Sequence, residues 1–152
     1  MIIYFGADHR GFSLKEHLKK IVQDRGYEVF DAGNAAYDEQ DDYTDFAVKV
    51  AEKVSQNPDG SRGVLMCGSG AGVDIVANKF PHVRSTLGLT SDQIYDARHD
   101  DDVNVLSFSA DVTSESDAEK ILKVFLETPY GREEHHARRL AKISELENNL
   151  YK

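Results

Sequence analysis

The hydrophobic residues of this chain fall into short runs that alternate with segments of helical spacing. Five runs of four or five residues are mostly apolar and lack the strict polar alternation of a half-exposed strand. Runs of this kind are typical of strands that are buried on both faces of a sheet. The predicted strands are Ile2–Phe5, Tyr27–Phe30, Gly63–Met66, Val83–Leu87 and Asn104–Phe108.

The segments between the runs carry apolar residues three or four positions apart, which is the spacing of one helix face. In the first helix, Ser13 and Glu16 are spaced as a capping box, and Gly26 is placed to end it. Thr44 is the expected cap of the second helix. The apolar stripes of these two helices are Leu14, Leu18, Ile21 and Val22, then Phe46, Val50 and Val54. The other predicted helices are Val73–Phe80, Ser91–Arg98, Ser114–Leu126 and about 134–150.

Strands that alternate with helices predict an open parallel α/β sheet. No repeat, linker or low-complexity tract interrupts the pattern, so one domain is expected over residues 1–152. Ligands of such sheets bind at the carboxyl ends of the strands, and we expect every charged or glycine-rich motif described below at those ends. The apolar face of the last helix is expected either to contact a partner subunit or to pack on its own sheet. That face consists of Leu140, Ile143, Leu146 and Leu150.

Composition limits the classes of partner. The formal net charge of −9 argues against a protein that coats nucleic acid or an anionic membrane, because both need a basic surface. It leaves room for a local basic pocket that binds a small anion. No stretch approaches the ~20 apolar residues of a membrane span, and the N-terminus lacks the basic region of a signal peptide. Cys67 is the single cysteine, which excludes an intramolecular disulfide and suits a reducing cytoplasm.

The loop Gly6–Gly11, after the first strand, groups Asp8, His9 and Arg10. A carboxylate, an imidazole and a guanidinium at a strand end can transfer protons and bind an anion. The alternative is a purely structural turn, in which the Asp8 carboxylate only accepts hydrogen bonds from backbone amides.

The loop Cys67–Gly72 follows the third predicted strand and opens a helix. Its glycines at alternate positions let backbone N–H groups converge on a phosphate or on the oxyanion of an enolate. A cysteine at the edge of such a loop suits a thiolate base, although a lone cysteine in an apolar run is often an inert core residue. The spacing is not that of a dinucleotide fingerprint, and Val73 stands where a phosphatase loop needs arginine.

Two charged segments lie further along the chain. A basic cluster over residues 132–142 is either part of a site or a solvated helix surface. Adjacent His135 and His136 cannot both reach one metal from a helix, so no metal site is expected there. The acidic run over residues 38–45 is expected to be a solvated loop. The segment that enters the fifth strand contains Arg98, His99, Asp100, Asp101 and Asp102.

Together these residues resemble the ribose-5-phosphate isomerase B family, which also includes galactose-6-phosphate and allose-6-phosphate isomerases. The resemblance covers nearly the whole chain, and its motifs are specific as a combination. They are Gly6–Lys15, Asp42-Tyr43, Cys67–Gly72, Ala77–Phe80, Asp102–Leu106 and Ala137–Arg139. The resemblance implies a Rossmann-like three-layer α/β/α fold with a five-stranded parallel sheet. It also implies dimers, or dimers paired into tetramers, whose active sites lie between subunits and need no metal or cofactor.

The resemblance implies roles for individual residues as well. Cys67 would move a proton between C1 and C2 of the sugar, with Ser69 near the sugar oxygens and Asp8 assisting ring opening. His9 and Arg139 would bind the phosphate, Arg139 in the site of the partner subunit. The substrate contacts would be His9, Arg10, Tyr43, Gly68, Gly70, Ala71, Gly72, Asp101, His135 and Arg139.

Three positions depart from the pattern of the family. Its ring-opening histidine would stand at Asp100, one residue after His99, and both remain candidate catalytic residues; Asp100 would need a raised pKa. Phosphate-binding arginines of the family correspond to Asp111 and His135, and a carboxylate beside a phosphate is unfavourable. The positive charge of the pocket is expected at His9, Arg10, Arg98, His135, Arg138 and Arg139.

Three functions therefore remain open. The default is an aldose–ketose isomerase that converts ribose 5-phosphate to ribulose 5-phosphate through an enediolate. The second is the same chemistry on another sugar, namely a hexose or tetrose phosphate or an unphosphorylated sugar. The third is a non-catalytic sugar-phosphate-binding module, against which Cys67 argues because binding alone needs no thiolate.

Overall fold

A computed structural model describes residues 1–150 and confirms the predicted α/β fold with a five-stranded parallel sheet. The strands are β1 (Ile2–Ala7), β2 (Glu28–Asp31), β3 (Ser61–Cys67), β4 (Ser85–Leu87) and β5 (Val105–Ser109). They are hydrogen-bonded in the order β2-β1-β3-β5-β4, and every pair is parallel. The last two residues of the single domain expected over residues 1–152 lie outside the part of the chain that the structure describes.

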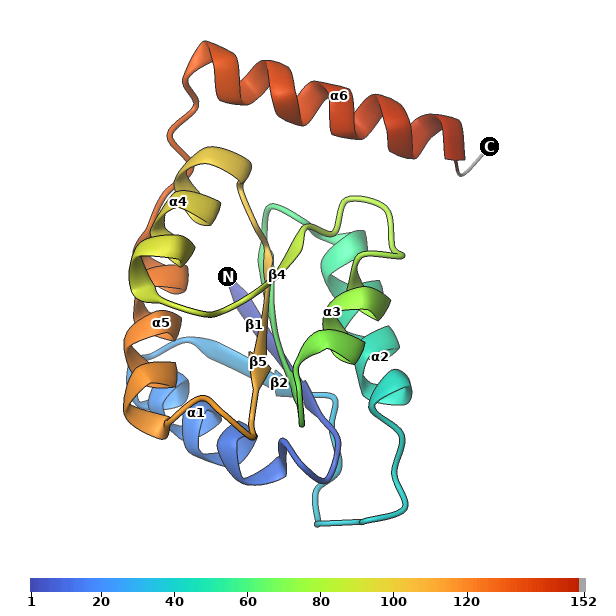
Figure 1. Ribbon diagram of the computed structural model, residues 1–152, viewed down its shortest axis with the longest axis vertical. Helices are drawn as coiled ribbons and strands as arrows, with labels where there is room; N and C mark the ends of the chain where they lie inside the picture. The colour runs from blue at the N-terminus through green and yellow to red at the C-terminus, as the bar shows by residue number, and fades with distance from the viewer. Residues whose placement is uncertain (151–152) are drawn as a thin grey trace.

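Helices cover both faces of the sheet and make the three layers that were predicted. On one face lie α1, α4 and α5, and on the other lie α2 and α3, while α6 crosses one end of the molecule (Figure 1). The helices are α1 (Phe12–Asp24), α2 (Tyr43–Gln56), α3 (Ala71–Ala77), α4 (Ser91–Asp101), α5 (Glu115–Glu127) and α6 (Glu134–Leu150).

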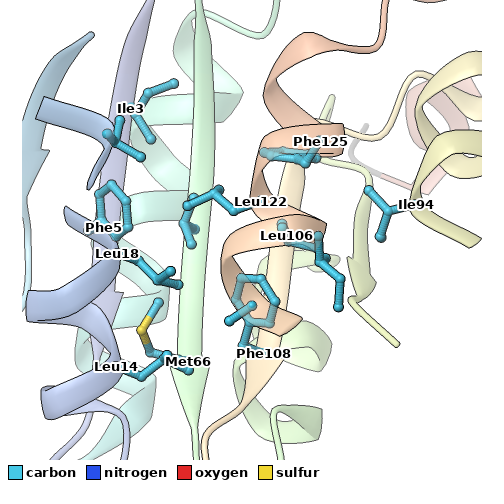
Figure 2. Packing of buried hydrophobic residues seen from close by; sticks show 14 of the residues in the cluster. Ile3, Phe5, Leu14, Leu18, Met66, Ile94, Leu106, Phe108, Leu122 and Phe125 are labelled. Carbon is cyan, nitrogen blue, oxygen red and sulfur yellow. The ribbon is translucent and has the colours of Figure 1, made fainter. Parts of the chain in front are cut away.

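The sheet separates two hydrophobic cores. On the side of α1 and α5, Phe5, Leu18 and Phe108 are fully buried among aliphatic side chains (Figure 2). The other core joins α2 and α3 to the sheet and includes Cys67. The expectation of strands buried on both faces holds for β1, β3 and β5, but it is wrong for β2 and β4, which are only partly covered because they form the two edges.

The predicted helix caps were correct at one position and wrong at two. Gly26 has a φ of 84° and follows the end of α1, as expected. Ser13 and Thr44 are not caps, because α1 begins at Phe12 and α2 begins at Tyr43, which places both side chains inside the first turn. The early start of α1 brings Gly11 to its N-cap, where its N–H meets the Asp8 carboxylate.

The last helix crosses one end of the molecule (Figure 1), where Glu147 accepts a hydrogen bond of 3.1 Å from the N–H of His82. Only His136 of α6 is buried, and Ile143, Leu146 and Leu150 are 38%, 61% and 77% exposed. Packing of this apolar face on the protein's own sheet, one of the two expectations, is therefore wrong. Over the 150 described residues, no helix has both the length and the apolar character that crossing a membrane requires.

Candidate active site

Cys67 is the last residue of β3, at the carboxyl edge of the sheet. Its side chain is only 4% exposed and contributes both to the core and to a small cavity of about 220 Å³. The cavity gathers residues from the loops after β1 and β3 and from the start of α2. Its lining residues are Asp8, Arg10, Tyr43, Cys67, Gly68, Ser69 and Gly72. The structure thus brings the two loops singled out in the sequence to one place.

The glycines of the loop after β3 allow close approach of the side chains around it. Gly70 is the N-cap of α3 with a φ of 75°, a conformation that other residues rarely adopt. A Cβ at Gly68 would lie 2.4 Å from the Arg10 guanidinium carbon, and one at Gly72 would lie 2.6 Å from the Tyr43 ring. The loop therefore presents its backbone directly to the cavity beside Cys67.

Asp8 does the structural work that the alternative interpretation assigned to it. Its buried carboxylate accepts a hydrogen bond of 3.0 Å from the N–H of Gly11, which holds the turn that leads into α1. The same side chain also lines the Cys67 cavity. The turn therefore fixes a carboxylate within the candidate site.

Arg10 is joined to Asp111 by an ion pair that spans the two loops. Asp111 follows β5, and its backbone N–H donates to the carbonyl of Gly68 at 3.1 Å. The carboxylate at position 111, expected to oppose a phosphate, is thus matched by a guanidinium from the loop after β1.

His9 turns toward Asp41 and does not line the cavity. The Asp41 carboxylate accepts hydrogen bonds of 2.8 Å from both the backbone N–H and the Nδ1 of His9. The bond to Asp41 raises the pKa of His9 above its ordinary value. Because the Asp41 side chain is only 6% exposed, the expectation of a fully solvated acidic loop is wrong at this residue. Sequence reasoning missed this pairing because 32 positions separate the two residues.

The other charged motifs lie at the opposite edge of the sheet, contrary to expectation. α4 runs back from the end of β4 to the start of β5, so its last residues, His99, Asp100 and Asp101, lie where the strands begin (Figure 1). The predicted end at Arg98 placed these residues in a loop, but the helix continues to Asp101. His135 and Arg139 are exposed on α6 at the same end. One chain therefore does not bring them to Cys67.

Carboxylates and imidazoles pair with each other at this second edge. Asp100 Oδ1 lies 2.8 Å from His99 Nδ1 and 3.3 Å from His136 Nε2. The bond between His99 and Asp100 raises the pKa of the histidine and lowers the pKa of the carboxyl. Asp100 thus lacks the raised pKa that a general acid at this position would need.

One group of described side chains has metal-ligand geometry, although the sequence suggested none. Ligand atoms of His99, Glu133 and His136 all lie within 4.8 Å of one another. The group uses His99 in place of His135, so the adjacency of the two histidines on α6 does not prevent it. His99 Nε2 lies 3.6 Å from Glu133 Oε1, and the pairing of imidazoles with carboxylates accounts for the cluster without an ion.

Arg98 does not line the Cys67 cavity, so the expectation that it adds positive charge to the substrate pocket is wrong; it lines a separate cavity with Arg62, Asp102 and Tyr130. Its side chain is 3% exposed and donates hydrogen bonds to the carbonyls of Val103 and Thr128 and to the Asp102 carboxylate. These bonds tie α4 to the loop before β5 and to the C-terminal end of α5.

The chain matches known proteins along most of its length. Residues 3–143 match the family described as Ribose/Galactose Isomerase. Ribose-5-phosphate isomerase B from Mycobacterium tuberculosis is 32% identical, with 97% of this chain and 90% of the relative aligned.

Solved structures agree with the sequence match. Ribose-5-phosphate isomerase B from Mycoplasma genitalium with bound ribulose-5-phosphate superposes with a TM-score of 0.93 at 35% identity, covering 97% of this chain and 96% of that one. The enzyme from Clostridium thermocellum superposes with a TM-score of 0.92 at 35% identity, covering 99% of both chains. The cysteine and glycine loop at the carboxyl edge, the fold and these matches show that the chain belongs to the ribose/galactose isomerase family.

Proposed function

We propose that this protein is an aldose–ketose isomerase that converts ribose 5-phosphate to ribulose 5-phosphate through an enediolate. The observation that carries the proposal is the Cys67 side chain in a small polar cavity shared with Asp8 and Arg10. Family membership and the ribulose-5-phosphate bound to the Mycoplasma genitalium enzyme support the same substrate class.

Residues that line the cavity and the rest of the loop after β3 have separate roles in the proposed reaction. The Cys67 thiolate removes the proton from C2 of the open-chain aldose and returns it to C1, while a proton moves from O2 to O1. Ser69 and the backbone amides of Gly68, Gly70, Ala71 and Gly72 stabilise the enediolate oxygens. Asp8 holds sugar hydroxyls and Tyr43 covers the ring. The Cys67 side chain is only slightly exposed to water, which limits side reactions of the enediolate.

A second copy of the chain completes the site in this proposal. His99, Asp100, Asp101, His135 and Arg139 lie at the far edge of the sheet, so they reach a Cys67 cavity only across an interface. The exposed apolar face of α6 suits a contact between subunits. We therefore propose a homodimer, or dimers paired into tetramers. The free thiol of Cys67 supports a location in the cytoplasm, where thiols stay reduced.

The proposal is tested by incubating the protein with ribose 5-phosphate in deuterated water. We expect deuterium at the carbon that exchanges during isomerisation, and its loss in both Cys67→Ala and Cys67→Ser. Circular dichroism of the two variants checks that the fold is retained. Exchange that survives in Cys67→Ala contradicts the role of the thiol, whereas binding without any exchange in the native protein indicates a non-catalytic sugar-phosphate-binding module.

A second candidate function is the same chemistry on a different sugar. It is favoured by the residue at position 100, where the ring-opening histidine of the family would stand and where this chain has an aspartate paired with His99 and His136. A tetrose phosphate is open-chain and needs no such step. Comparison of kcat/KM for phosphorylated and free sugars of four to six carbons separates the candidates, and a clear preference for ribose 5-phosphate would eliminate this one.

A further inference from the structure

The ion pair between Arg10 and Asp111 indicates how the proposed isomerase holds its substrate, and this inference rests on that proposed function. We propose that Arg10 binds the anionic end of the substrate beside Cys67. Asp111 is a positioning residue that holds the Arg10 guanidinium in place for that contact.

Arg10 is the positively charged residue that the lining of the Cys67 cavity contains. Its guanidinium lies against the backbone of Gly68, next to the thiol, yet its side chain is 55% exposed and open to a ligand. His9, the neighbouring cation when protonated, is turned toward Asp41 instead. An anionic substrate with its reacting carbons at Cys67 therefore meets Arg10 first.

Asp111 is itself held rigidly to the loop that carries Cys67. The N–H groups of Ala110 and Asp111 donate to the carbonyls of Cys67 and Gly68, at 2.9 and 3.1 Å. The Asp111 carboxylate accepts from Nη2 of Arg10, which leaves Nε and Nη1 as donors for a phosphate. A guanidinium held in this way loses little further side-chain freedom when it binds an anion.

The pair lies at the boundary between two cavities. Arg10 lines the cavity of about 220 Å³ at Cys67, and Asp111 lines a neighbouring cavity of about 470 Å³. Ser69 lines both of them. A phosphate that binds Arg10 is therefore placed at this boundary, a fixed distance from the thiol, and the ion pair selects substrates by the length between reacting carbon and anion.

Calorimetry with ribose 5-phosphate and with ribose, on protein that also carries Cys67→Ala, measures binding without turnover. In Arg10→Ala we expect the Kd for ribose 5-phosphate to rise roughly 10- to 100-fold, with little change for ribose, as for the loss of a charged hydrogen bond. Arg10→Lys keeps the positive charge but loses the paired N–H donors of the guanidinium. Its Kd for ribose 5-phosphate should therefore lie between those of the native protein and Arg10→Ala. The matched control is Arg25→Ala, which removes another surface arginine paired with a carboxylate, Glu127.

A double-mutant cycle tests the role of Asp111. Asp111→Ala should raise the Kd for ribose 5-phosphate by roughly 3- to 10-fold in the native background. When Arg10→Ala is also present, removal of the unpaired carboxylate should leave the Kd unchanged or lower it. Arg10→Ala combined with Asp111→Arg should recover most of the affinity for ribose 5-phosphate, because the loop after β5 then supplies the guanidinium in place of the loop after β1.

Two results would overturn the proposal. One is native affinity for ribose 5-phosphate in Arg10→Ala, and the other is an additive effect of the two alanine substitutions. Failure of the proposed catalytic function looks different, because the native protein would then bind ribose 5-phosphate through Arg10 without exchanging its protons.

Discussion

The Asp41 carboxylate accepts two hydrogen bonds from one residue, His9, through its backbone N–H and its Nδ1, each 2.8 Å long. The pair closes the acidic loop before α2 onto the loop after β1. Because the side-chain bond raises the pKa of His9, its protonated form is more stable in the folded chain than in the unfolded one.

The first prediction concerns the pH dependence of this pair. A raised pKa in the folded state gives a stabilisation that is fully present below the unfolded pKa and is lost as the pH rises through the folded pKa. We therefore expect Asp41→Asn to lower the pKa of His9 and to lower Tm more at pH 6 than at pH 9. NMR titration of the His9 ring protons measures the shift, and an unchanged titration in the variant contradicts the prediction.

The second prediction concerns a fully buried lysine. Lys15 Nζ lies 2.5 Å from Asp31 and 2.9 Å from Glu16, and it also donates to the Asn34 carbonyl at 3.1 Å. Burial alone would raise the pKa of Asp31, but hydrogen bonds from Lys15 and Lys19 lower it overall.

Asp31→Asn leaves the Lys15 charge poorly compensated, and we expect it to reduce the free energy of unfolding by about 3 kcal/mol. Chemical denaturation at pH 7 measures the loss. The stabilisation from Asp31 should fade as the pH falls through its lowered pKa, because the native carboxylate then becomes protonated. The control is Lys20→Ala, which removes an exposed pair with Asp24 and should cost less than about 0.5 kcal/mol. A similar loss in both variants contradicts the prediction.

The third prediction compares two glycines with positive φ. Gly26 has open space where a Cβ would lie, whereas a Cβ at Gly70 would come within 2.8 Å of the Phe108 backbone. Gly26→Ala should therefore cost about 1 kcal/mol for the backbone conformation alone. Gly70→Ala adds a backbone clash, so thermal unfolding should show a clearly larger loss, together with loss of the proton exchange. Equal losses of stability in the two variants would contradict the prediction, because the loop after β3 would then move freely enough to accept the added Cβ.

The fourth prediction tests α6 as the contact between subunits. Leu146→Asp places a charge in the exposed apolar face and should shift the protein toward monomers in analytical ultracentrifugation. Proton exchange should fall with it, because the two halves of the site separate. Ile75→Asp is the control, since Ile75 on α3 is 60% exposed, as Leu146 is at 61%, and does not line the Cys67 cavity. An unchanged sedimentation coefficient for Leu146→Asp refutes the role of this face.

The pattern of apolar runs predicts all five strands because burial on a parallel sheet dictates both composition and length. Family resemblance and layered fold are confirmed. Helix starts are harder to predict. Ser13 has the residue type and spacing of a cap, yet the Asp8 turn starts α1 one residue before it, and that turn depends on tertiary contacts.

In the candidate site, too, local sequence features could be predicted and tertiary contacts could not. The loop after β3 could be located because glycine spacing and a cysteine are local signals. The ion pair that Arg10 forms beside this loop could not be predicted, because its partner Asp111 lies 101 positions away in the sequence. The location of Asp100 also depends on the direction in which α4 returns along the sheet. The catalytic roles of these residues stay predictions.

The position of Cys67 allows the candidate site to be titrated with a thiol-directed reagent. A chain with one thiol, placed at the cavity, takes up at most one equivalent of a thiol-directed reagent, and that equivalent lands in the candidate site. Because the side chain is 4% exposed, bulky reagents should react slowly and a bound sugar phosphate should slow them further. Labelling stoichiometry therefore counts competent sites directly, and the labelling rate reports how often each of them is open.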